Sequence, residues 1–82
     1  MKQYHFTVVL EPDREEPHRY NVRVPALPDC LTYGESIEDA LANAHEAITG
    51  YVESLLADGE PIPTEKHPAI AATVVVTTDA AA

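Results

Sequence analysis

The 82-residue sequence has a single cysteine and few basic residues. One cysteine excludes an intrachain disulfide, so we expect a protein of a reducing compartment, without the covalent framework of small secreted domains. Its five lysines and arginines are outnumbered by fourteen aspartates and glutamates, which gives a formal net charge of −9. Because nucleic-acid binding depends on basic groups that neutralise phosphates, no direct binding to DNA or RNA is expected.

Long apolar runs and glycine-rich loops are also lacking. No segment reaches the roughly 20 apolar residues of a membrane-spanning helix, and the amino terminus lacks the apolar stretch of a signal peptide. The three glycines are spread out, which excludes a phosphate-binding loop, and the four histidines show no zinc-site spacing. We therefore expect a cytoplasmic protein with no membrane partner, no metal, no cofactor and no catalytic residues.

Two alternating segments open the chain, at residues 3–11 and 19–24. Each places apolar side chains on one side of an extended backbone, and the charged loop between them favours an antiparallel pair. Pro25 and Pro28 then bracket a predicted turn, because neither can donate to a central ladder. Leu27 is expected to pack beneath this turn.

A third strand is predicted at residues 30–33, where Gly34 would end it by allowing a positive φ. A helix is predicted at 36–58, since Ser36 is a good amino-terminal cap and apolar residues then recur every three or four positions. Gly59 provides its stop, and the proline-rich "GEPIP" leads the chain out of the helix.

An uncharged, β-branched run predicts a fourth strand at residues 70–78. The expected fold is a single α+β domain over residues 1–82 with the order β-β-β-α-β. Its sheet would be four-stranded and mostly antiparallel, in the order 3-2-1-4, with one long helix on one face. The second face would be uncovered, which favours a homodimer or a larger assembly.

The lone thiol, Cys30, has two possible interpretations. It could belong to a cysteine–histidine nucleophilic pair, because such partners meet only in space. A buried packing residue is the favoured interpretation, because a reactive thiol needs a specific electropositive setting. A hydrolase is accordingly the least favoured function.

Two stretches, "YHFTVVLEPD" and "YNVRVPALPDCLTYGESIEDALANAHEAITGYVESLLADGEPIP", resemble the HicB-like antitoxin family. The resemblance implies a partial ribonuclease H-like domain that binds a small basic HicA-like toxin, an enzyme that cleaves messenger RNA. Only about twenty residues follow the "PIP" exit, so a stand-alone domain without a DNA-binding module is expected. The structural motif comprises Pro25, Leu27, Pro28, Cys30, Gly34, Ser36, Gly59, Pro61 and Pro63.

Acidic residues are the candidate contacts with such a toxin, whose RNA surface they could occupy. They lie in the first connection and at the start of the helix, at Asp13, Glu15, Glu16, Glu35 and Asp39. Each one taken singly could equally be an ordinary solvated charge. The alternative function is an orphan homo-oligomeric domain that binds a protein or a ligand on its open sheet face.

Overall fold

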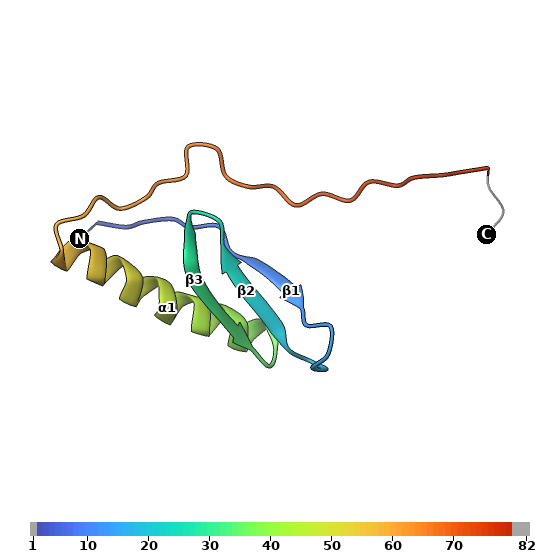
Figure 1. Cartoon of the computed structure of the whole chain (residues 1–82), viewed down its shortest axis with the longest axis horizontal. Helices are drawn as coiled ribbons and strands as arrows, with labels where there is room; N and C mark the ends of the chain where they lie inside the picture. Colours follow the sequence, from blue (N-terminus) through green and yellow to red (C-terminus); the bar gives the residue numbers. More distant parts are fainter. Residues whose placement is uncertain (1, 80–82) are drawn as a thin grey trace.

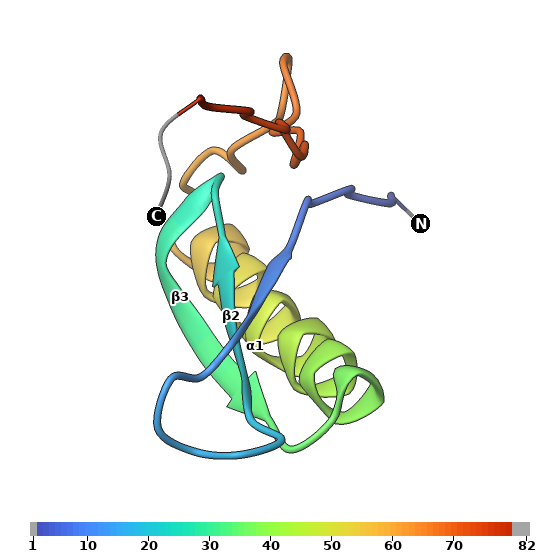
Figure 2. The ribbon, with the colours of Figure 1, turned by 90° about the vertical axis from the view of Figure 1, so that its right-hand side faces the viewer.

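The computed structural model describes residues 2–79 and contains three strands followed by one helix (Figure 1). The elements are β1 (Val9–Pro12), β2 (Tyr20–Val24), β3 (Leu27–Gly34) and α1 (Ile37–Ala57). The strands form one antiparallel sheet in the order β1-β2-β3. Figure 2 shows α1 lying across one face of this sheet. None of the described helical structure has the length and apolarity needed to cross a bilayer.

The expected fourth strand is not formed, so the predicted four-stranded sheet with the order 3-2-1-4 is wrong. Residues 70–78 are extended but exposed, and they run away from the sheet (Figure 1). β-branched side chains favour an extended backbone, yet a strand also needs a neighbour to receive its hydrogen bonds. The observed architecture is β-β-β-α.

A tight hairpin joins β2 to β3. Val24 pairs with Leu27 across a two-residue turn at residues 25–26. The sequence predicted a turn bracketed by the two prolines, and this is wrong, because Pro25 lies within the turn and Pro28 follows it in β3. β3 begins at Leu27 rather than at residue 30. The next pair is Arg23 with Leu31, which leaves residues 28–30 bulged out of the ladder. Pro28 is tolerated there because a bulged residue on an edge strand needs no ladder hydrogen bond.

The core lies between the sheet and α1. Small side chains of α1 face the strands, and the hairpin contributes the largest fully buried side chain, Leu27. Around it, Val24 and Cys30 form one cluster, to which the extended segment before β1 adds Phe6 and Val8. The buried residues are Val22, Val24, Leu27, Cys30, Ala40, Ala44 and Val52.

Gly34 permits this close packing for a reason other than the predicted one. Positive φ angles in the described chain belong to Gly59 and His18, not to Gly34. A Cβ at Gly34 would instead overlap the backbone of Ala40 and lie 2.7 Å from the carbonyl carbon of Asp39. The missing side chain therefore lets the first turn of α1 rest against the end of β3.

The ends of α1 follow the sequence signals. Ser36 is the amino-terminal cap, and its Oγ accepts a hydrogen bond of 3.0 Å from the backbone N–H of Asp39. The helix ends at Ala57, and Gly59 follows with φ of 68°, a conformation that glycine adopts at little cost.

Candidate functional site

The two acidic groups predicted from the sequence lie at the same end of the sheet (Figure 2). One belongs to the β1–β2 connection and the other to the β3–α1 junction. Tyr20 pairs with Gly34, and Arg19 Nη2 lies 3.9 Å from Glu35 Oε1, so the two segments are adjacent. We call this surface the acidic end, comprising Asp13, Glu15, Glu16, Glu35, Glu38 and Asp39.

Asp13 organises the β1–β2 connection. Its Oδ1 accepts hydrogen bonds from the backbone N–H groups of Glu15 and Glu16, at 2.8 and 2.9 Å. Its Oδ2 accepts a third bond, of 2.8 Å, from Asn21 Nδ2. These donors, with the Asn21 amide contributing most, lower the pKa of Asp13 to about 2. Asp13 is therefore a fixed negative charge that shapes the loop and exposes its two glutamates.

Asp39 has a comparable structural role at the start of α1. Its Oδ2 accepts a 2.8 Å hydrogen bond from the backbone N–H of Glu35, while its own N–H donates to Ser36 Oγ. This reciprocal arrangement resembles a capping box, and the carboxylate also lies at the positive end of the helix dipole. Asp39 thus fixes the geometry of the junction that presents Glu35.

Arg19 is a neighbour of the acidic end that the sequence did not single out. Its guanidinium lies 4.3 Å from the centre of the Tyr33 ring, and its contact with Glu35 is at the outer limit of an ion pair. A pair at this distance, with Arg19 half-buried and Glu35 exposed, is weak, so Glu35 is only partly neutralised. The pairing became visible only when the fold placed the start of β2 beside the end of β3.

A shallow hollow of about 470 Å³ separates the β1–β2 connection from the start of α1. His18 and Tyr20 line one side, and Glu35 and Glu38 line the other. Ile37, also in its lining, is 52% exposed. Ile37 is the first apolar residue of α1, but the helix turns Ala40 and Ala44 to the sheet and leaves Ile37 at the margin.

Cys30 has the properties of a packing residue. Its side chain is buried, and this desolvation raises the pKa of the thiol above its ordinary value. A protonated thiol is a poor nucleophile. Within residues 2–79, no group of three or more histidine, cysteine, aspartate or glutamate residues is placed to hold a metal ion.

The face of the sheet opposite α1 is a second open surface. Leu31 and Tyr33 project from β3 with 69% and 50% of their surface exposed. Beside them, Arg23 Nε lies 3.1 Å from Glu11 Oε1. This outer face mixes apolar groups with opposite charges, whereas the acidic end carries mainly one sign.

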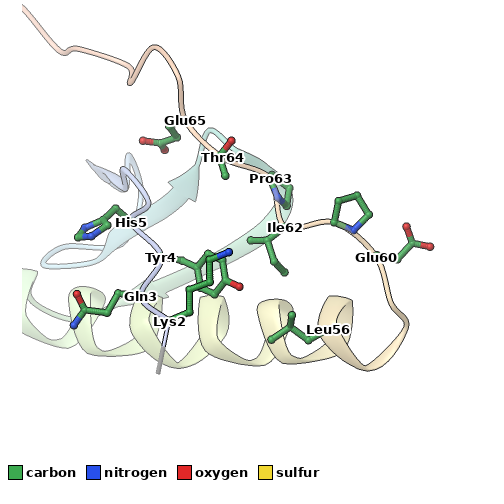
Figure 3. A pocket seen from close by; sticks show the side chains of 11 residues that line it. Lys2, Gln3, Tyr4, His5, Leu56, Glu60, Ile62, Pro63, Thr64 and Glu65 are labelled. Carbon is green, nitrogen blue, oxygen red and sulfur yellow. The ribbon is translucent and has the colours of Figure 1, made fainter.

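The proline-rich exit from α1 lies over the amino-terminal segment (Figure 3). Pro61 and Pro63 line a hollow of about 530 Å³, where Ile62 points toward α1 and Tyr4 lies beside it (Figure 3). Glu65 also lines this hollow. Each proline has a fixed φ and cannot continue the helix, so the segment leaves the end of α1 in an extended conformation.

The chain was compared with known proteins. A family model described as the HicB-like antitoxin of bacterial toxin–antitoxin systems matches residues 6–77. A UPF0150 protein of Thermoplasma acidophilum is 45% identical over 60 residues, which is 73% of this chain and 84% of the relative. Another UPF0150 protein, from Synechocystis, is 40% identical over 62 residues, 76% of each chain.

One solved structure also resembles the fold. It is the crystal structure of the N-terminal domain of the Burkholderia pseudomallei antitoxin HicB, with a TM-score of 0.62 and 38% sequence identity. The match covers 70% of this chain and 65% of that chain, so it spans just under two thirds of the solved structure.

Proposed function

This chain belongs to the HicB-like antitoxins of bacterial toxin–antitoxin systems, and from that premise we propose that it neutralises a small basic HicA-type toxin. In this proposal the acidic end covers the surface with which the toxin binds RNA. An enzyme that cleaves RNA must hold phosphates with basic groups. Clustered carboxylates can occupy the same groups and so exclude the substrate.

The observation that carries the proposal is the meeting of two acidic segments at one end of the sheet. Glu15 and Glu16 are held outward by the Asp13 turn, and Glu35 stands next to the same loop. The net charge of −9 adds a long-range attraction for a basic partner. Such complementarity speeds association and orients the partner before close contact.

Five of the six residues of the acidic end divide into two roles. Asp13 and Asp39 already accept hydrogen bonds from their own chain, so they position the loop and the helix start. Glu15, Glu16 and Glu35 are the side chains proposed to meet arginine or lysine on the toxin. Buried apolar contacts supply much of the affinity of most interfaces, and the exposed Ile37 is the nearest apolar anchor.

A binding role rather than a catalytic one is the second part of the proposal. It is supported by the antitoxin family itself and by the buried, protonated state of Cys30. The carboxylates of Asp13 and Asp39 accept hydrogen bonds from backbone N–H groups and from the Asn21 amide, and this arrangement presents the neighbouring glutamates for recognition of cations on a partner surface.

A homo-oligomeric domain without a toxin partner is the alternative function. The observation in its favour is the outer face of the sheet, where Leu31 and Tyr33 are exposed. That face would bind a second copy, a different protein or a small ligand. The two functions differ in the charge that the partner must carry, since only the antitoxin function requires a basic partner.

Co-expression tests the antitoxin proposal. The partner would be the small basic protein encoded beside this chain, expressed alone or together with it in the same cells. We expect growth arrest with the partner alone, rescue by this chain, and a complex that copurifies. Absence of a complex together with unrelieved arrest would contradict the proposal.

A further inference from the structure

The structure leaves one strand-forming segment unpaired, and it leaves one regular strand edge free. The C-terminal arm, defined as residues 69–78, is uncharged and extended, and within the described chain it pairs with no strand. Ile70, Val74, Val75 and Val76 are between 77% and 89% exposed. A β-branched, uncharged segment in this state is a ready partner for any free strand edge.

The sheet has two edge strands, β1 and β3. β3 is interrupted by its bulge at residues 28–30, and the carbonyl oxygen of Tyr33 already accepts a 2.8 Å hydrogen bond from Asn43 Nδ2, so the regular free edge belongs to β1. Asp13 donates its N–H to the carbonyl oxygen of Arg19, just before β2. Glu11 and Val9 then pair with Asn21 and Arg23 of β2. Because successive N–H groups along a strand point to opposite sides, the N–H and C=O of Leu10 face away from β2. Pro12 then ends this edge, since it lacks an N–H.

The arm does not lie in register with the β1 edge of its own chain. Glu65 is fixed to the segment before β1, where its carboxylate accepts bonds of 2.8 Å from both the N–H and the Oγ1 of Thr7. β1 lies two to five positions after Thr7. The residues at the same distance after Glu65, which would lie beside β1, are 67–70. This stretch includes Pro68, which cannot donate to a ladder, and it ends before the valines.

We propose that the arm of each chain pairs with the β1 edge of a second copy, so that two chains exchange arms reciprocally. The linker at residues 66–68, which follows the Glu65 anchor, would carry each arm across to its partner. Reciprocal exchange is a closed two-fold arrangement, and it satisfies both arms and both edges at once. A different protein that received the arm would leave the β1 edge of this chain open.

Charge also favours a second copy joined through the arm. Two chains with a net charge of −9 repel each other, and β1 carries Glu11, so pairing is favoured with a segment that is itself free of acidic groups. The arm has no charged residue between Pro68 and Thr78. Its backbone can therefore approach the partner without bringing carboxylates together.

Light scattering on the full chain tests this proposal, with variants placed in the arm. Wild type should have twice the mass of one chain at micromolar concentration. Adjacent N–H groups point to opposite sides, so either Val75→Pro or Val76→Pro must remove a ladder bond. We expect at least one of them to weaken dimerisation by about tenfold or more, whereas Val75→Thr should preserve the dimer because threonine favours strands equally.

Circular dichroism provides the control for folding. The arm makes no packing contact in the core, so the helical signal and the thermal transition of the monomeric body should survive the proline substitutions. A monomeric wild type would overturn the proposal. A dimer that persists in both proline variants would also overturn it, because the interface would then lie elsewhere, for example on the outer face of the sheet.

Discussion

Gly34 lies against the backbone of Ala40, so that no side chain separates the last residue of β3 from the first turn of α1. Ala40 is itself fully buried, and its small side chain completes the contact with Val22. The acidic end depends on this approach, because it sets the position of Glu35 and Asp39 relative to β2. The junction is therefore both a packing contact and the support of the proposed binding surface.

Substitution of Gly34 by alanine should destabilise the fold. The added Cβ would overlap rigid backbone, and overpacking of this kind costs about 1–3 kcal/mol. The matched control is Gly50→Ala, because a Cβ at Gly50 would meet no atom within 4 Å. Removing glycine from a helix interior at such a site should stabilise the protein by up to ~1 kcal/mol. Thermal melting should therefore shift in opposite directions, and equal shifts would contradict this account of Gly34.

The stability of the β1–β2 connection should depend on pH through Asp13. Its pKa is lowered from 3.8 to about 2 in the folded chain, so its stabilising contribution is complete above about pH 4 and is lost as the pH falls toward 2. Asp13→Asn removes the charge and should lower the urea midpoint at pH 7. The difference from wild type should shrink as both are titrated from pH 4 to pH 2. A difference that stays constant over this range would show that the carboxylate charge is not responsible.

The start of α1 shows how much of the fold the sequence could predict. Ser36 was identified as the cap, and the helix begins at the next residue, because capping is a local interaction between neighbours in the chain. The burial of Leu27 and Cys30 also followed from local pattern. Membership of the HicB-like family, indicated by the same motif, is confirmed by the family match.

The fourth strand could not be predicted in the same way. Residues 70–78 carry the right composition, but pairing depends on where the linker is anchored, and the anchor is a contact between Glu65 and Thr7, which are 58 positions apart. The role of Gly34 was missed for a related reason, since the approach of Ala40 is tertiary. At the acidic end, residue types were evident, whereas the roles of Arg19 and Asn21 required the strand register.

Charge-reversal variants distinguish the contribution of the acidic end to toxin binding from the contribution of the net charge of the whole chain. The double substitution Glu15→Lys, Glu16→Lys should weaken binding to a basic HicA-type toxin by about tenfold or more. It replaces two outward carboxylates by positive groups, which repel the basic groups of the toxin. The matched control is Glu46→Lys with Glu53→Lys, which makes the same change in net charge on exposed positions of α1. The control should lose only the long-range part of the attraction, and that part should fade at high salt. Equal losses in the two double variants would place the interface elsewhere.

The most direct measurement is inhibition of RNA cleavage in a purified system. The basic protein encoded beside this chain would be mixed with a labelled RNA, and this chain would be added in increasing amounts. Our account predicts that cleavage stops near one chain per toxin and that the Glu15, Glu16 double variant requires a large excess. Unchanged cleavage at any ratio, with no complex detected by calorimetry, would contradict it.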